Sequence, residues 1–405
     1  GQITGDFSVE EAQTLSVLLT SGALPASLDV VEERSVGAAL GADSIKSGLI
    51  TGAIGLVLVV VMMVGLYGAW GLLASAVLGL NVMLTLTALG LLGATLTLPG
   101  IAGIILCLGI AVDSNILIFS RIREETAKGT VAIKALTLGY GRAWATILDA
   151  NITTLLAMLL LFMFGAGAIR GFAVTMSLGI VISIFTAAVL MRFMMEWLVR
   201  RRKLKRLEIR PLFGTVRSPG AFSFMRRGRL ALGLSAALSV GALGLIAVPG
   251  LNLGIEFTGG MQMVLRAEAP VPLSELRTAI AAQVPGDARL QSFGEPNEAL
   301  IRVQGEASQA TVAAVEQAAS QTVPSAVFDQ IDLVGPTIGG ELATTGLIAL
   351  GLAIFAMLAY IWVRFEWHFA AGAIAVLFLD VTKTLGVIAL LGWEVNLTTI
   401  VALLT

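Results

Sequence analysis

The sequence is poor in chemically reactive side chains: its 405 residues include one cysteine, one histidine and three tyrosines. The single Cys107 excludes a disulfide framework and a cysteine metal cluster within this chain. The single His368 has no second ligand near it, so we expect no metal site. The sequence also lacks a nucleotide-binding loop, a zinc motif and a nucleophile elbow. We therefore expect no catalytic residues and no bound cofactor.

Charge is scarce as well: 13% of the residues are charged and 57% are hydrophobic, and the mean hydropathy is +0.90. Soluble domains contain about 45–50% apolar residues, so this composition predicts a polytopic membrane protein. A membrane-spanning helix needs about 20 apolar residues. Runs of this kind lie at about 48–66, 72–92, 99–119, 143–164, 172–191, 230–248, 342–362 and 368–391. A further run begins at Leu397.

The few positive charges are concentrated beside particular apolar runs. Residues 120–142 carry five basic side chains, and residues 192–229 contain the run RRRKLKR. The opposite loops, 93–98 and 165–171, together carry only Arg170. The positive-inside rule therefore places 120–142 and 192–229 in the cytoplasm. Because the basic run adjoins two membrane runs, orientation explains it better than nucleic-acid binding, and we expect no nucleic-acid partner.

The segment from Pro249 to about Gly340 has a different pattern, in which short strands alternate with amphipathic helices. The order ββαββαβ begins with GIEF at 254–257 and predicts a small α+β domain of the split βαβ type. Counting the membrane crossings places this domain outside the cytoplasm. The expected fold is an all-α polytopic membrane bundle with a small α+β periplasmic domain.

The chain contains an internal repeat. VGAALG at 36–41 matches VGPTIG at 334–339, an offset of 298, and LLG at 91–93 matches LLG at 390–392, an offset of 299. Ordered matches at an almost constant offset indicate two parallel copies of one module, related by a pseudo-twofold axis along the membrane normal. By this symmetry we expect a helix and most of a soluble domain upstream of residue 1, and a counterpart of Asp113 near position 412.

One carboxylate lies inside an otherwise apolar run: Asp113 is the only charged residue between Pro99 and Phe119. A charged group at the centre of a membrane helix costs about 2.5–3.5 kcal/mol on insertion scales, and such carboxylates usually mark ion paths. Asp149 lies six residues into the next run, which is antiparallel to the first, so we expect both carboxylates at similar depth.

Further polar side chains accompany these carboxylates. A polar cluster at one level of a bundle can bind and release a proton, so we predict a proton relay with the proton as coupling ion. Its members are Asp113, Asn115, Asp149, Asn151 and Thr154. The alternatives are that Asp113 only hydrogen-bonds a neighbouring helix and that Asp149 is an interfacial capping group. The Gly-x-Gly-Asp signature of intramembrane aspartyl proteases does not precede Asp113.

Two smaller groups complete the candidate residues. Asp380 and Lys383 lie about one helical turn apart and are a candidate ion pair. Phe257, Gly259 and Gly260 lie where a strand leaves the membrane, and we expect a structural or hinge role because glycine permits unusual backbone geometry.

Four stretches resemble, in order, the SecD/SecF family of bacterial protein-export membrane proteins. ERSVGAALGADSIKSG resembles the SecD entry into the membrane, and AVDSNILIFSRIREE resembles its fourth-helix signature, with Asp113 at the membrane aspartate. DANITTLLAMLLLFMFGAGAIRGFA resembles the next two SecD helices, and GIEFTGG resembles the start of the SecF periplasmic domain. Ser114 departs from the alanine expected there. The basic linker implies that SecD-like and SecF-like halves are fused in one polypeptide.

The resemblance implies an accessory subunit of the Sec preprotein translocase, driven by the proton-motive force, in the bacterial inner membrane. Its implied partners are the SecYEG channel, with YajC and YidC as further candidates, unfolded preprotein on the periplasmic side, and membrane lipids. Two alternatives stay open. One is a proton-coupled exporter of small molecules or lipids of the related RND superfamily, and the other is a structural scaffold of the Sec channel.

The resemblance also divides the chain into six parts. These are the end of a first periplasmic domain (1–46), SecD-like transmembrane helices (47–196), a basic cytoplasmic linker (197–228), a SecF-like first transmembrane helix (229–249), a SecF-like periplasmic α+β domain (250–340) and further SecF-like transmembrane helices (341–405).

Overall fold

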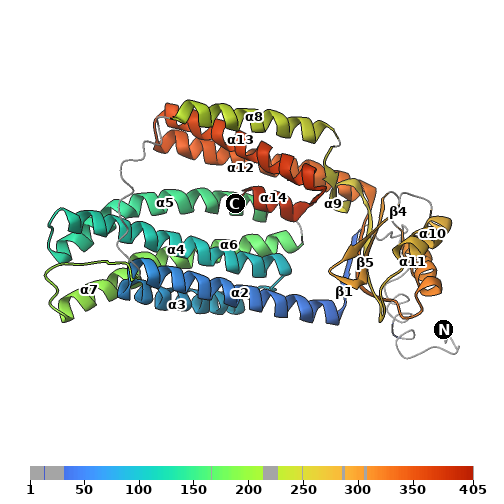
Figure 1. Cartoon of the computed structure of the whole chain (residues 1–405), viewed down its shortest axis with the longest axis horizontal. Helices are drawn as coiled ribbons and strands as arrows, with labels where there is room; N and C mark the ends of the chain where they lie inside the picture. The colour runs from blue at the N-terminus through green and yellow to red at the C-terminus, as the bar shows by residue number, and fades with distance from the viewer. Residues whose placement is uncertain are drawn as a thin grey trace, which may run out of the picture.

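The computed structural model describes residue 13 and residues 32–165, 167–212, 227–248, 250–284, 288–304 and 308–404. Most of the predicted segment 1–46 and the middle of the predicted linker 197–228 lie outside these residues. A bundle of long helices carries a small α+β domain at one end (Figure 1). Within the described residues, eight helices are long and apolar enough to cross a membrane.

The helices form two groups. The first contains α2 (Ala38–Tyr67), α3 (Ala69–Leu91), α4 (Leu98–Ala127), α5 (Ala132–Phe164), α6 (Ala168–Phe185), the π-helical turn η1 (Thr186–Met191) and α7 (Arg192–Arg201). The second contains α8 (Gly228–Ala247), α12 (Pro336–Arg364), α13 (Trp367–Leu391) and the shorter α14 (Leu397–Leu404). In Figure 1, α8, α12 and α13 lie together along one side of α5, and α2 and α3 lie on its other side.

The expected loop at 120–142 is largely helical, which corrects the prediction from the sequence. α4 and α5 extend beyond the apolar runs and leave only residues 128–131 between them. The cause is a buried carboxylate: Glu125 is 3% exposed, forms an ion pair of 2.8 Å with Lys128, and also pairs with Arg142 on α5. These ion pairs hold the two helices together where the hydrophobic pattern has ended.

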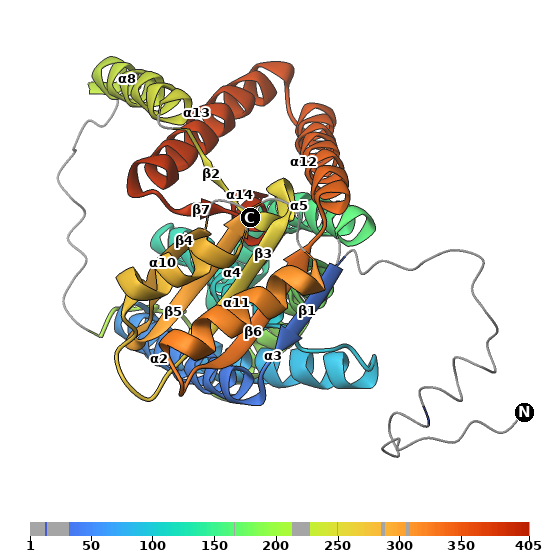
Figure 2. The same cartoon turned by 90° about the vertical axis from the view of Figure 1, so that its right-hand side faces the viewer.

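The α+β domain is built on a five-stranded antiparallel sheet, with strand order β1-β6-β3-β5-β4. Its elements are β1 (Glu32–Val36), β3 (Gly260–Arg266), α10 (Leu273–Gln283), β4 (Ala288–Phe293), β5 (Glu295–Gln304), α11 (Gln309–Thr322) and β6 (Val327–Val334). Helices α10 and α11 cover the face of the sheet that is turned away from the bundle (Figure 2). The fully buried Met263, Ile301 and Val315 belong to the core between these helices and the sheet.

The segment GIEF was predicted as a strand and is instead mostly a short helix, α9 (Ile255–Thr258). The reason lies in the glycines that follow it. Gly259 and Gly260 have φ of 70° and 132°, values that end the helical turn and re-aim the chain, so β3 begins only at Gly260. A two-stranded parallel pair is formed by β2 (Asn252–Leu253), which precedes α9 in the chain, and β7 (Glu394–Val395), which lies between α13 and α14 in the chain.

The pairing of β1 with β6 reproduces the sequence repeat. Arg34 lies opposite Asp332, and these positions are 298 residues apart, which is the offset of the repeat at this end of the helices. An antiparallel pair has a local twofold axis, so this axis relates each strand to its counterpart in the other module. Gly37 and Gly335 precede the next helices with nearly identical angles, φ −62°, ψ 149° and φ −64°, ψ 147°. The predicted pseudo-twofold axis therefore passes through this pair of strands.

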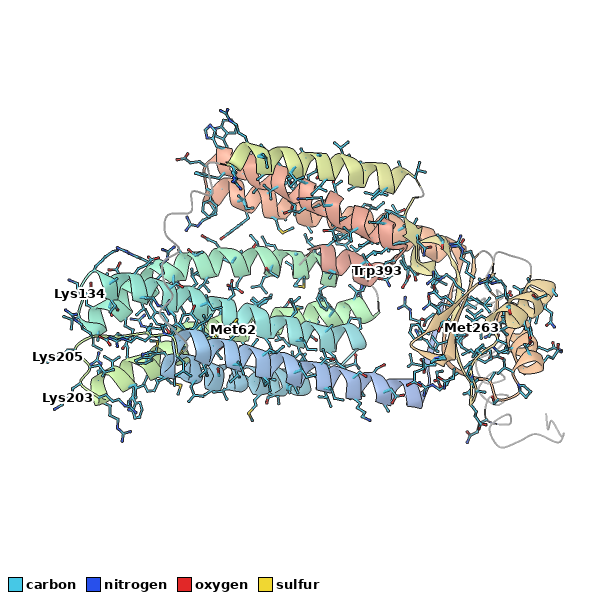
Figure 3. All side chains as sticks on the ribbon, viewed as in Figure 1. Met62, Lys134, Lys203, Lys205, Met263 and Trp393 are labelled. Atoms are coloured by element: carbon cyan, nitrogen blue, oxygen red, sulfur yellow. The ribbon has the colours of Figure 1, made fainter. Side chains whose placement is uncertain are left out.

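Basic residues from the segments 120–142 and 192–229 lie at the end of the bundle opposite the α+β domain. Figure 3 shows Lys134, Lys203 and Lys205 together at one end, and Met263 in the domain at the other end. This separation agrees with the orientation predicted from the positive charges, in which the domain lies outside the cytoplasm.

Candidate functional site

Asp113 lines a cavity of about 350 Å³ between α4 and α5. Its side of α4 is formed by Leu106, Gly109, Ile110, Asp113, Ser114 and Leu117, whose spacing of three and four residues places them on one helical face. The side formed by α5 contains Thr146, Ile147, Ala150, Asn151 and Thr154. The cavity is thus an apolar space with one carboxylate and four uncharged polar side chains.

The Asp113 carboxyl is exposed on this face, whereas the neighbouring Val112 and Ser114 are buried. Among the described residues, no side chain forms a hydrogen bond or an ion pair with it. The nearby polar groups bond to their own helix: Asn151 Nδ2 donates to the Ile147 carbonyl at 2.7 Å, and Thr154 Oγ1 to the Ala150 carbonyl at 3.2 Å. A carboxyl group without a fixed partner can gain or lose a proton without breaking an ion pair.

Two of the predicted relay residues lie away from this cavity. Asn115 is buried on another face of α4, where its Nδ2 donates to the Ala111 carbonyl at 3.1 Å. Its Oδ1 is buried and has no hydrogen-bond partner in the described part of the chain. Asp149 does not line the cavity and instead faces α12. The cavity therefore brings together Asp113, Asn151 and Thr154, and the role of all five residues in proton transfer stays a prediction.

Asp149 connects the two groups of helices. Its Oδ1 accepts hydrogen bonds from Tyr360 Oη at 2.7 Å and from Arg364 Nε at 2.9 Å, both on α12. Neither partner was predicted from the sequence. One feature of the sequence indicates a role for Arg364, because it is a positive charge at the end of an apolar run. Its pairing with Asp149 could not be predicted, because more than 200 residues separate the two.

The sequence analysis also missed Ser114 and Thr146, which line the cavity. For both residues, helical spacing indicates a position on the cavity face. Ser114 lies one turn after Ile110 on α4, and Thr146 lies two turns before Thr154 on α5, so each shares a face with another cavity residue.

The predicted pair of Asp380 and Lys383 is present, with 2.8 Å between Lys383 Nζ and Asp380 Oδ1. Lys383 Nζ also donates to Ser235 Oγ on α8 at 3.0 Å. Ser239, one turn further along α8, donates to the Leu379 carbonyl at 3.3 Å. These contacts join α13 to α8. Both helices belong to the second group, whereas the Asp113 cavity lies in the first.

The motif with Phe257, Gly259 and Gly260 lies at the junction of the domain and α12. A Cβ atom on Gly339, in the first turn of α12, would lie 2.8 Å from the Gly259 nitrogen. A Cβ atom on Gly260 would overlap the carbonyl oxygen of Val303 on β5. Phe257 is half-buried, and its N–H donates to the Gly254 carbonyl at 3.0 Å. The glycines thus permit a close approach of backbone segments.

Comparison with known families assigns the chain to one of them. The family described as protein export membrane protein SecD/SecF, C-terminal, matches residues 20–200 and 314–405, about two thirds of the chain. The chain belongs to the SecD/SecF family. The SecD/SecF GG motif matches residues 244–271, which include Gly259 and Gly260. In this SecD/SecF chain the motif forms the junction described above.

The curated relatives of this chain include a SecDF subunit and SecD subunits. The protein translocase subunit SecDF of Brucella abortus is 34% identical over 409 residues, covering 100% of this chain and 54% of the relative. The protein translocase subunit SecD of Magnetococcus marinus is 51% identical over 207 residues, covering 51% of this chain and 39% of the relative. The chain thus spans about half, or less, of the length of these relatives. Such relatives are transport components, and this chain is a multi-pass membrane protein.

Solved structures agree with the fold. The crystal structure of SecDF from Thermus thermophilus, a translocon-associated membrane protein, matches with a TM-score of 0.87 at 35% identity, covering 99% of this chain and 55% of that one. A crystal structure of SecDF in a super-membrane-facing form matches with a TM-score of 0.70 over 98% of this chain and 54% of that one. This SecD/SecF chain therefore resembles the first of these structures more than the second.

Proposed function

We propose that this chain belongs to an accessory subunit of the Sec preprotein translocase, which uses the proton-motive force to assist protein export across the bacterial inner membrane. The observation that carries the proposal is the position of Asp113 in a membrane-level cavity, in a member of the SecD/SecF family. Protons are the coupling ion, and the mechanism requires no other cofactor. Each proton that crosses the membrane supplies about 2.3 kcal/mol per 100 mV.

The proposed cycle begins with proton binding at Asp113. Protonation removes the only charge in the cavity, and release restores it, so the two states differ in how strongly the cavity attracts water and polar groups. Asn151 and Thr154, which line the same cavity, are candidates to exchange their bonds within α5 for bonds to this carboxyl. Such a change alters the packing of α4 against α5.

The helices offer a direct path from this change to the α+β domain. α2 and α12 begin immediately after β1 and β6, which pair in the sheet of the domain. A displacement of either helix therefore moves the sheet. We propose that this motion acts on unfolded preprotein on the periplasmic side of the membrane.

The proposed partners are the SecYEG channel, with YajC and YidC as further candidates, and membrane lipids around the helices. Support comes from the relatives, which are described as translocase subunits and, for the Thermus thermophilus protein, as translocon-associated.

The test replaces Asp113 by Asn in the full-length protein and measures export of a preprotein into membrane vesicles with and without a proton gradient. We expect the variant to lose the part of export that depends on the gradient and to retain the rest. The matched control is Glu124→Gln, because Glu124 lies on the same helix but is exposed and pairs with Arg121.

Three other results decide between the proposal and its alternatives. Unchanged gradient-dependent export in Asp113→Asn, at normal membrane level and channel association, would contradict the proton-relay function. Loss of export together with loss of channel association would favour a structural scaffold. Proton-coupled export of small molecules or lipids with unchanged protein secretion would favour the RND-type exporter.

A further inference from the structure

The α+β domain meets the membrane helices at a junction made from segments that are far apart in the sequence. β2 follows α8, and β7 separates α13 from α14. In their parallel pairing Asn252 lies opposite Glu394 and Leu253 opposite Val395. The Gly254 N–H then donates to the Val395 carbonyl at 2.9 Å. The connection between α13 and α14 is therefore fixed to the start of the domain.

A largely buried ion pair crosses this junction. Arg302, on β5 of the sheet, pairs with Glu394 on β7, and their side chains are only 7% and 19% exposed. Arg302 also donates to Gln262 Oε1 at 3.2 Å. Its Nε is buried and has no hydrogen-bond partner in the part of the chain that the structure describes. The guanidinium is thus enclosed beside Glu394 with one donor unused.

A second carboxylate lies against the first. A Cβ atom placed on Gly254 would lie 2.5 Å from Glu256 Oε2 and 2.7 Å from Glu394 Oε1. Because both distances start from one point, these two oxygens are at most about 5.2 Å apart. A Cβ atom at position 254 would displace these oxygens from their present positions, so glycine here permits the approach. Two carboxylates this close repel each other when both are ionised.

Glu256 adds a negative charge beside the ion pair of Arg302 and Glu394. Among the described residues Glu256 forms no ion pair of its own, so no cation in contact with it offsets its charge at this half-buried site. A proton bound by either carboxylate would remove the repulsion between the two.

Three other charged groups lie near this cluster. Lys383 on α13 lines a cavity shared with Glu394, but its ammonium group pairs with Asp380. Arg289 on β4 lies opposite Arg302, and Asp332 on β6 lies opposite Gln262. Both Arg289 and Asp332 have interactions of their own.

We propose that Glu256 and Glu394 form a proton-binding site, sharing one proton beside Arg302, and that this proton links the docking of the α+β domain on the membrane helices to the pH on the domain side of the membrane. The site is separate from the Asp113 cavity: it lies outside the membrane-spanning segments and involves only the second group of helices and the domain.

The electrostatics give the direction of the effect. Burial raises the pKa of the Glu394 carboxyl above its usual value of 4.5, Arg302 opposes this shift and Glu256 adds to it. The docked arrangement therefore binds a proton more readily than an arrangement in which Glu394 is in water. This stabilisation is fully present below pH 4.5 and is lost as the pH rises through the raised pKa of Glu394. Acid on the domain side thus favours docking.

The test measures the distance between spin labels at Ser320 on α11 and Glu366 before α13, in the full-length protein with its native cysteines replaced and held in lipid nanodiscs. Both labelled positions are exposed. We expect two distance populations, with the docked population increasing as the pH falls from about 8 to about 4, a range that includes raised glutamate pKa values.

Substitutions identify the groups that titrate. Because one proton is shared, Glu394→Gln and Glu256→Gln should each abolish the pH dependence and remain docked, and the double variant should behave like either one. The matched control Glu275→Gln, an exposed carboxylate in the first turn of α10, should titrate like the unsubstituted protein. If one variant fails to fold, the other still tests the proposal.

The proposal is wrong if the unsubstituted protein shows one distance at every pH, or if both glutamine variants retain its transition. No channel, preprotein or proton gradient is present in this experiment. A failed test therefore leaves the proposed role of Asp113 in export intact, and a failure of the Asp113 test leaves this site intact.

Discussion

Arg364 on α12 donates a hydrogen bond of 2.9 Å to Asp149 on α5 and so joins the second group of helices to the first. Tyr360, one turn earlier on α12, donates to the same carboxylate oxygen at 2.7 Å. Asp149 is 17% exposed and Arg364 is 45% exposed, so the pair lies at the edge of the contact. Any rearrangement that separates α5 from α12 must break these bonds.

Removing this link should weaken the contact between the helix groups. We expect Asp149→Asn and Arg364→Gln each to cause a small loss of thermal stability, because solvent screens the exposed arginine. The double variant should lose no more than the larger single effect, since both changes remove the same bond. Thermal unfolding in detergent measures all three. Fully additive losses would show that the pair does not interact.

Polar side chains in the Asp113 cavity should affect gradient-dependent export more than stability. We expect Asn151→Leu and Thr154→Val to reduce the gradient-dependent part of export several-fold, less than Asp113→Asn does, because each removes one of several polar groups. Thr153→Val is the matched control, since Thr153 is on the same helix but does not line the cavity. Equal effects at Thr153 and Thr154 would contradict a specific role for the cavity.

Arg266 should stabilise the domain more through its contact with Asp329 than through its contact with Asp43. Arg266 Nε lies 3.0 Å from Asp329 Oδ2, which is buried, and Arg266 Nη2 lies 3.3 Å from Asp43, which is 60% exposed. The Arg266 and Asp329 side chains are close enough to form an ion pair, but their orientation does not allow a hydrogen bond. We expect Arg266→Gln to destabilise the domain by about 2 kcal/mol, because it leaves a buried carboxylate unpaired.

Asp43→Asn is the matched comparison for Arg266→Gln. It should cost less than about 1 kcal/mol, because an exposed ion pair contributes little. Both variants are measured by chemical denaturation of the full-length protein in detergent, with a probe in the α+β domain. A larger loss for Asp43→Asn than for Arg266→Gln would contradict this assignment.

Gly260 should tolerate no side chain. Its φ of 132° is a conformation that residues other than glycine rarely adopt, and a Cβ atom would overlap the Val303 carbonyl oxygen. We expect Gly260→Val to destabilise the domain by about 3 kcal/mol or more, from backbone strain together with the clash. Gly346→Ala on α12, where a Cβ atom meets nothing within 4 Å, should be neutral or slightly stabilising. Normal thermal stability of Gly260→Val would contradict this role.

Features encoded locally in the sequence were predictable. The apolar runs located the membrane helices, and the repeat offset of 298 located the twofold relation that Arg34 and Asp332 display. The ends of the helices were less predictable, because Glu125 extends α4 and α5 through an ion pair with Arg142, 17 residues away. Hydrophobic pattern alone carries no information about such a pair.

The candidate site was predictable to a similar degree. The sequence placed Asp113, Asn151 and Thr154 in one cluster, and all three line the cavity, but it also included Asn115 and Asp149, which lie on other faces of their helices. The partners of Asp149 were not predictable, because Tyr360 and Arg364 belong to the other module and only the packing of α5 against α12 brings them near. The pairing of Arg302 with Glu394 depends in the same way on a contact between distant segments.

The twofold relation between β1 and β6 has a mechanical consequence. Gly37 and Gly335 each follow their strand directly, with nearly identical angles, and the next residue already belongs to a long membrane helix. The two hydrogen-bonded strands therefore connect the outer end of α2 directly to the outer end of α12. A displacement of the sheet therefore moves the outer ends of both helices together, one in each module.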